Sequence, residues 1–389
     1  MFQFDVDARR KGIGNMKGNM LAEIPEDSVM LWGAEMDYPT APCVRCALTA
    51  FAENGLYGFT LSSDEYTGAI RRWMQKMRKA EIEEDWVIPT MGTVYSLCTA
   101  VRAFTKKGDG IIIQSPSYYR FDRAIERNER TVVYNPLICE DGCYSLDFDD
   151  LEMKMSQPRN RLMILVNPHN PTGKVFSEAD LLRIRDIAKR NNVIVFSDEI
   201  FAETAQPGFE TRPYAVMDEQ GITSFSLGKS FNFTGVSQAN LLIPNKDLRE
   251  AYIAQRNREH YGSIDPFFYN AVLAAYSEDG AAWIHAMNAH TKENYELIRD
   301  TFAEEMPLLS ISPLEGTFVA WIDCRKLGMN DDSLQYFFKN AAKIYADPGY
   351  EYGEGGSGRV RWNIGTSKTT IERALKLLKT AYDQYTIQD

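Results

Sequence analysis

The 389-residue sequence predicts an α/β protein with a mostly parallel central sheet flanked by helices, joined to a smaller α+β domain. From about residue 86 to 245, short apolar runs alternate with amphipathic stretches, as in parallel strands connected by helices. After about residue 281 a long helical stretch, an alternating segment and an amphipathic helix follow one another. This change of pattern predicts two domains.

The elements follow from these patterns. Between the predicted strands lie helical stretches such as 177–190, which Ser177 and Asp180 begin as a capping box. Residues 308–325 alternate like an antiparallel strand pair, and 369–385 predict the last helix. The predicted strands are 110–115, 130–134, 162–167, 193–197, 223–227 and 240–243.

Composition excludes several kinds of partner. A net charge of −11 gives no global attraction to nucleic acid or to an anionic membrane surface. Asp5 and Asp7 lie where a signal peptide needs an apolar run, and no segment reaches the roughly 20 apolar residues of a membrane span. We therefore expect a cytoplasmic protein that binds a small molecule.

Cysteines and histidines do not predict a metal site. Cys43 and Cys46 fall in a predicted helix that begins at Pro42, and Cys139 and Cys143 bound an acidic turn without a nearby histidine. The four histidines have no ligand spacing. We expect no metal, and six sparse cysteines fit a reducing compartment.

Three predicted strands end in polar residues. Asn170 lies in the Pro-rich loop after 162–167, Asp198 follows 193–197, and Lys229 follows 223–227. Taken singly, these are typical of a turn, a helix cap and a solvated surface charge. Because the carboxyl ends of parallel strands are where such sheets bind ligands, their joint occurrence favours a site.

The motifs around these residues carry a family resemblance. NPHNPTG, SDEI, SLGKSFNFTG and RVRWNIG, in this order, resemble the fold-type I enzymes of the class I/II aminotransferase superfamily, which use pyridoxal 5′-phosphate. GAEMDYPTAPCVRCAL, SPSYYRF and PGYEYGEGGSGRVRWN resemble the MalY/PatB branch of carbon-sulfur β-lyases. The resemblance spans nearly the whole chain and implies the fold-type I architecture.

The resemblance assigns the residues around the cofactor ring. It implies that Lys229 is the catalytic base and binds the cofactor covalently, for which a desolvated amine of lowered pKa is suited. Asp198 is expected to pair with the pyridine nitrogen and Asn170 to bind the phenolic oxygen. Tyr118, also catalytic, is expected to stack on the ring, with Ile200 among the cofactor contacts.

The resemblance also assigns the phosphate and substrate groups. Arg361 is expected to hold the substrate α-carboxylate with its two-pronged guanidinium, together with Asn170, which implies an amino-acid substrate. Gly33 and Ala34 are expected beside that carboxylate, although a plain extended segment is an equal alternative. For the phosphate, the resemblance implies the helix N-terminus at Gly92, Thr93 and Val94 and the hydroxyl of Ser226.

The sequence departs from the branch at three places. Branch members usually have Tyr where this chain has Phe59, with the hydroxyl reaching the cofactor phosphate across a dimer interface. Tyr57 is the nearest substitute, unless the phosphate is held differently. Phe201 replaces the usual His, and Lys17-Gly18-Asn19 replaces Lys-Trp-Asp.

The function that the resemblance implies is a carbon-sulfur β-lyase acting on cystathionine or cysteine. An aminotransferase is the alternative, because it needs the same residues, and a regulator that binds the cofactor without turnover comes third. The resemblance further implies a homodimer with the active site at the interface. Residues 51–283 are expected to form the large cofactor-binding domain, and 1–50 with 284–389 the small one.

Overall fold

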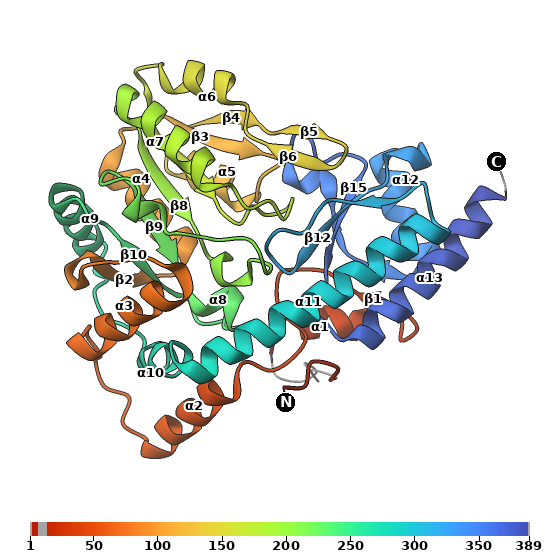
Figure 1. Ribbon diagram of the computed structural model, residues 1–389, viewed down its shortest axis with the longest axis horizontal. Coiled ribbons are helices and arrows are strands. Elements are labelled where there is room, and N and C mark those ends of the chain that lie inside the picture. Colours follow the sequence, from red (N-terminus) through yellow and green to blue (C-terminus); the bar gives the residue numbers. More distant parts are fainter. Residues whose placement is uncertain (1, 7–13, 388–389) are drawn as a thin grey trace.

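A seven-stranded sheet forms the centre of the larger part of the molecule (Figure 1). The computed structural model describes residues 2–6 and 14–387. In spatial order the strands are β2 (Val87–Met91), β10 (Gln238–Leu242), β9 (Ile222–Phe225), β8 (Ile194–Asp198), β7 (Asn160–Val166), β3 (Gly110–Ser115) and β4 (Thr131–Pro136).

The sheet is mostly parallel, as predicted. Strands β9, β8, β7, β3 and β4 run parallel to one another. Strand β10 runs antiparallel to both β9 and β2. The structure therefore confirms the predicted sheet and adds β2, an edge strand that the sequence did not predict.

Helices cover both faces because successive strand residues point to opposite sides. Ile111 and Ile113 pack with α4 (Thr93–Phe104), α5 (Arg120–Arg127) and α9 (Lys246–Arg258). Ile112 packs on the other side with α6 (Phe148–Met155) and α7 (Glu178–Asn191). The predicted capping box of Ser177 and Asp180 begins α7.

A second, four-stranded sheet belongs to the smaller part of the molecule. Its order is β11 (Ser310–Ile311), β12 (Val319–Asp323), β15 (Arg359–Asn363) and β14 (Asp347–Pro348), and all its neighbours are antiparallel. The pairing of β11 with β12 confirms the expected antiparallel pair. The helices here are α1 (Met16–Glu23), α12 (Asp331–Tyr336) and α13 (Lys368–Thr386).

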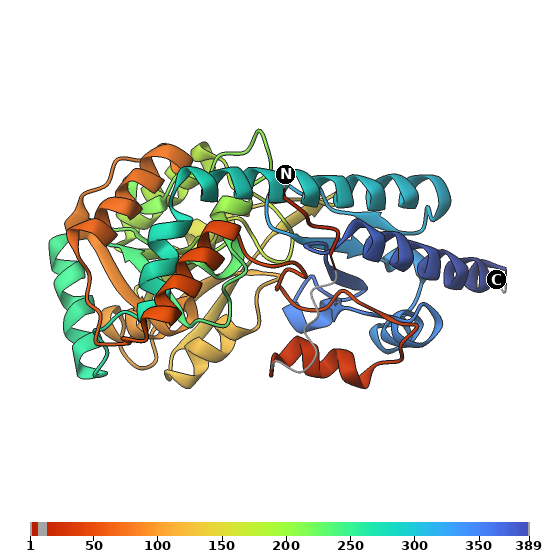
Figure 2. The ribbon, with the colours of Figure 1, turned by 90° about the horizontal axis from the view of Figure 1, so that it is seen from below.

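Residues from both chain ends share one hydrophobic core in this part. Val29 and Leu31 pack with Trp362 and with the buried face of α13, and β1 (Val29–Met30) pairs with β13 (Ile344–Tyr345). The long helix α11 (Glu278–Glu305) runs from one part of the molecule to the other (Figures 1 and 2). It passes through the expected domain limit at 283, so that limit stays a prediction.

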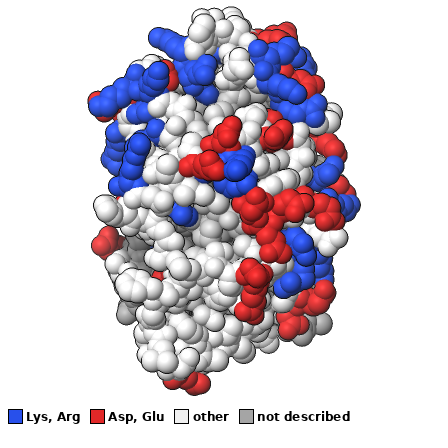
Figure 3. Space-filling view, turned by 90° about the vertical axis from the view of Figure 1, so that its left-hand side faces the viewer, with Lys and Arg blue, Asp and Glu red and all other residues white. Residues whose placement is uncertain are grey.

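An apolar segment is exposed beside α2 (Pro42–Asn54) and α10 (Pro266–Ala275). Leu56, Tyr57, Phe59 and Leu61 are all exposed. On the face that contains these two helices, the lower left and central part is largely free of charged side chains, which lie mostly in the upper half and along the right edge (Figure 3). The remaining elements are α3 (Asp64–Arg78), α8 (Leu227–Ser230) and the hairpin β5 (Ile138–Glu140) and β6 (Cys143–Ser145). None of the described helices is both long and apolar enough to span a membrane.

Candidate active site

A cavity of about 440 Å³ lies at the carboxyl ends of the parallel strands, between the two sheets. It brings together all the residues that the sequence assigned to the site except Tyr57: Gly33, Ala34, Gly92, Thr93, Val94, Tyr118, Asn170, Asp198, Ile200, Ser226, Lys229 and Arg361. Residues more than 300 positions apart in sequence thus meet around one space.

Lys229 extends from the short helix α8 into this cavity. Its Nζ donates to the Ala34 carbonyl at 2.6 Å. Burial, and next the nearby Arg361 charge, lower the pKa of the Lys229 amine to about 8. A desolvated amine of this kind is a nucleophile and a base near neutral pH.

Asp198 ends β8 with its carboxylate buried at the cavity. One carboxylate oxygen accepts the Ile200 amide at 3.2 Å, and burial raises the pKa of Asp198 to about 7. A cationic group in the cavity would therefore favour its ionised form.

The next residue, Glu199, is held away from this site. It forms a fully buried ion pair with Arg78 and accepts the Tyr214 amide at 2.9 Å. Because the Arg78 guanidinium neutralises the Glu199 carboxylate, Glu199 does not add an unpaired buried negative charge next to Asp198.

Asn170 and Arg361 are in direct contact. Arg361 Nη1 donates to Asn170 Oδ1 at 2.8 Å, and the guanidinium lies 5.1 Å from the centre of the Tyr352 ring. Both side chains are buried. With its oxygen directed at Arg361, the Asn170 amide presents its nitrogen as the donor for the cavity.

The N-terminus of α4 faces the same cavity. Gly92 is the N-cap residue, without a side-chain cap, and Thr93 and Val94 open the helix. The first amide groups of a helix lack intrahelical acceptors and suit an anion. Ser226 lies nearby, but its hydroxyl donates to the Gln238 carbonyl at 2.7 Å and accepts the Gly228 amide, so its role within the chain is to cap α8.

Aromatic and apolar residues complete the walls. Tyr118 is largely buried, which raises the pKa of its hydroxyl, and its ring contacts Tyr119 edge-on at 5.1 Å. Phe201 is buried against Phe318 and borders the cavity with Ile200, so it presents an apolar group there.

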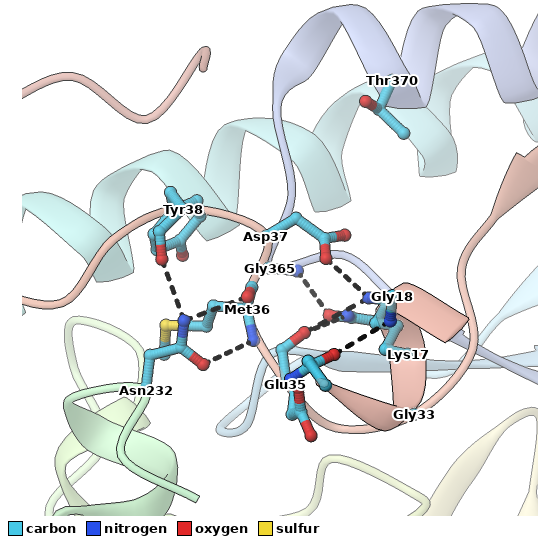
Figure 4. Close-up of polar contacts among 12 residues, drawn as sticks. Lys17, Gly18, Gly33, Glu35, Met36, Asp37, Tyr38, Asn232, Gly365 and Thr370 are labelled. Atoms are coloured by element: carbon cyan, nitrogen blue, oxygen red, sulfur yellow. Dashed lines mark hydrogen bonds and ion pairs between the residues drawn. The ribbon is translucent and has the colours of Figure 1, made fainter. Parts of the chain in front are cut away.

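The segment 33–38 is attached to three other parts of the chain (Figure 4). Asn232, three residues after Lys229, accepts the Met36 amide at 3.1 Å and donates to the Met36 and Tyr38 carbonyls at 3.0 and 2.9 Å. Lys17 of α1 lies 2.7 Å from Asp37 and is itself buried. The Asp37 amide donates to Gly365 at 2.8 Å.

Tyr57 and Phe59, the two residues considered for contact with the phosphate, lie outside the cavity. Tyr57 is exposed, donates its hydroxyl to the Ala52 carbonyl at 2.7 Å and does not line the cavity. Phe59 projects fully into solvent. Within one chain, neither residue reaches the site.

Sequence reasoning did not assign four charged residues that, among the residues described, line the cavity: Lys17, Glu35, Arg120 and Asp347. Asp347 pairs with Arg361, and Arg120 lies 6.0 Å from the Tyr118 ring. Arg120 follows directly on the SPSYY motif, which was the available signal. Asp347 had no such signal in the motifs, because its relation to Arg361 depends on strand pairing.

The residues fit pyridoxal 5′-phosphate, the cofactor that the resemblance implies. A buried carboxylate suits a pyridinium, a desolvated lysine suits an aldehyde, and a helix N-terminus suits a phosphate. All three line the one cavity. Within residues 2–6 and 14–387, no group of three or more potential metal-ligating side chains is present.

Comparison with known proteins gives a family match. Residues 28–378 match the family described as Aminotransferase class I and II. The chain is 30% identical over 384 residues to cystathionine beta-lyase PatB of Bacillus subtilis, covering 97% of this chain and 99% of the relative. It is 32% identical over 347 residues to protein MalY of Escherichia coli, covering 88% of each.

A solved structure is also closely similar. Cystalysin from Treponema denticola, which contains a pyridoxal 5′-phosphate cofactor, superposes with a TM-score of 0.95 at 31% identity. The match covers 99% of both chains. It confirms the fold expected from the resemblance.

Proposed function

The chain belongs to the class I and II aminotransferase family, and from this premise we propose that it is a pyridoxal 5′-phosphate-dependent carbon-sulfur β-lyase. The proposed reaction converts an amino acid such as cystathionine or cysteine to pyruvate, ammonia and a thiol or hydrogen sulfide. The observation that carries the proposal is the 30% identity to a cystathionine beta-lyase along 97% of the chain.

The cofactor would be held at five points. Lys229 binds it covalently, Asp198 pairs with the ring nitrogen, Asn170 donates to the phenolic oxygen and Tyr118 covers the ring. The α4 N-terminus receives the phosphate. When bound, the cofactor accepts the electron pair left at the substrate Cα.

The chain's own residues would supply binding and proton transfer. Arg361 binds the α-carboxylate and so orients the Cα–H bond. Once the substrate amine has displaced it from the cofactor, the Lys229 amine would remove the Cα proton. The Cβ–S bond would then break, and the sulfur would leave as a thiolate that takes up a proton to become the thiol. A positioned base of this kind contributes roughly 10² to 10⁴ in rate.

The first test of this proposal is the product. The cofactor-loaded protein is expected to release pyruvate and a thiol from L-cystathionine, measured by lactate dehydrogenase coupling and by a thiol reagent. A turnover that yields equal amounts of both supports β-elimination. Absence of pyruvate with every sulfur amino acid contradicts it.

An aminotransferase is the second candidate, favoured by the family match itself. In that case L-glutamate or L-alanine converts the bound cofactor to its pyridoxamine form, and a keto acid restores it. The absorbance spectrum of the bound cofactor therefore distinguishes transamination from β-elimination. A protein that binds the cofactor but gives neither reaction is the third alternative, a regulator.

The proposed assembly is a homodimer with the active site at its interface. The exposed residues Leu56, Tyr57, Phe59 and Leu61 support it, because adjacent exposed apolar side chains favour burial against a partner. In this assembly Tyr57 is proposed to reach the partner's phosphate site in place of the tyrosine that Phe59 replaces.

A further inference from the structure

One carboxylate oxygen of Asp347 accepts three hydrogen bonds in the cavity wall. Oδ2 of Asp347 lies 2.8 Å from Arg361 Nη2, 3.3 Å from Arg361 Nε and 2.9 Å from the Gly33 amide nitrogen. The Asp347 and Arg361 side chains are only 8% and 4% exposed. This is a buried ion pair that also includes a backbone amide.

Strand pairing sets the position of this carboxylate. Asp347 of β14 is the direct partner of Arg361 of β15 in the antiparallel ladder. Directly opposite residues have side chains on the same face of a sheet. The backbone therefore fixes Asp347 beside Arg361 whatever occupies the cavity.

The contacts of Arg361 use its Nε–Nη2 edge and one hydrogen of Nη1. Asp347 takes the Nε edge, and Asn170 accepts one hydrogen of Nη1 at 2.8 Å. A guanidinium has five N–H donors, so the fork formed by Nη1 and Nη2 retains donors for a further carboxylate. Arg361 lines the cavity, where such a carboxylate would lie.

We propose that Asp347 is a positioning residue for the substrate α-carboxylate, because it holds both the Arg361 fork and the Gly33 amide in their binding arrangement. This proposal rests on the part of the proposed function that makes the substrate an amino acid bound at Arg361. It does not depend on which bond of the amino acid then breaks.

Two features indicate that Asp347 positions Arg361 and does not compete with the substrate carboxylate for it. Gly33 has a left-handed φ of +78°, and its amide reaches the same oxygen as Arg361, so Asp347 links the 33–38 segment to β15. Removing one member of a buried charge pair leaves the other uncompensated and free to reorient. Loss of Asp347 should then disorder the Arg361 fork that binds the substrate carboxylate.

The test measures binding by the rapid initial change in the cofactor absorbance, before any slower turnover of L-alanine. L-alanine and ethylamine, which differ in the carboxylate, are titrated into the cofactor-loaded enzyme while the cofactor absorbance is followed. Asp347→Asn is expected to weaken L-alanine binding about tenfold to a hundredfold, with ethylamine affinity unchanged within twofold, as losing a hydrogen bond to a charged group does. Combined with Arg361→Gln, the same change should add less than twofold.

Controls separate positioning from damage to the sheet. Asp323→Asn, in β12 of the same sheet, breaks a pair with Arg325 outside the cavity and should leave L-alanine binding unchanged. If Asp347→Asn does not fold, Asp347→Ser is the second variant, with the same expected result. Unchanged or tighter L-alanine binding overturns the proposal, and so does an equal loss for both ligands. A protein that passes this test but yields no pyruvate refutes the lyase and leaves the role of Asp347 standing.

Discussion

The two lysines that line the cavity are in opposite environments. Lys229 Nζ has a neutral carbonyl partner, Ala34, and burial lowers the pKa of its amine to about 8. Lys17 Nζ lies 2.7 Å from the Asp37 carboxylate, in an ion pair with a charged partner. Only a neutral amine attacks an aldehyde, so the environments select Lys229.

This selection predicts where the cofactor attaches and at what pH. Borohydride reduction of the loaded protein, followed by peptide mass analysis, should find the cofactor on Lys229. Since the neutral fraction rises as the pH increases through the pKa, the rate of attachment should increase up to about pH 8 and then level off. Lys229→Ala should abolish attachment and turnover, whereas Lys17→Met should retain attachment. A label on Lys17 would show that the wrong lysine was assigned.

At the scale of elements, the segment 33–38 connects α1, the Lys229 loop and β15. Lys17 contacts Asp37 and the Glu35 carbonyl, and Asn232 holds Met36 from the other side (Figure 4). The same segment supplies the Ala34 carbonyl that contacts Lys229. The ion pair of Lys17 therefore holds the segment 33–38, which under the proposed function lies beside the substrate carboxylate, without contacting Lys229 itself.

The expected effect of Lys17→Met is on substrate binding. KM for the amino-acid substrate should rise about tenfold, equivalent to ~1.4 kcal/mol, while kcat falls less and the absorbance of the bound cofactor is unchanged. Lys343→Met is the matched control, because Lys343 pairs with Asp27 on the surface and both are exposed. A loss of cofactor binding in Lys17→Met, or an unaltered KM, would contradict this role.

The sequence predicted those parts of the site that lie at strand ends. Asp198 and Asn170 follow buried apolar runs, and the pattern of such runs marks where strands end. It does not encode strand direction, so the antiparallel orientation of β10 became visible only in the fold. Asp347 and Lys17 were missed for a related reason: their partners, 14 and 20 residues away, are brought to them by register and tertiary packing.

At the scale of the whole molecule, the exposed apolar segment supports the proposed homodimer. Phe59 is fully exposed and Leu56 is 74% exposed. Tyr57 of the same segment contacts Phe51 of α2 and Phe267 of α10, and these two helices pack together. The segment is thus anchored to the two helices by Tyr57, while Leu56 and Phe59 remain exposed to solvent. Its position on the part of that face that is largely free of charged side chains fits the proposed contact with a second copy of the chain (Figure 3).

This arrangement predicts that a charge in the segment breaks the dimer. Phe59→Asp should shift the protein from dimer to monomer in sedimentation velocity, because an exposed carboxylate there would lose its hydration at the interface. If Tyr57 completes the partner's phosphate site, the monomer should also bind the cofactor at least tenfold more weakly. Met153→Asp is the matched control, since Met153 is 58% exposed on α6, away from α2. A Phe59→Asp protein that remains dimeric would place the interface elsewhere, and a monomer with undiminished cofactor affinity would remove Tyr57 from the partner's site.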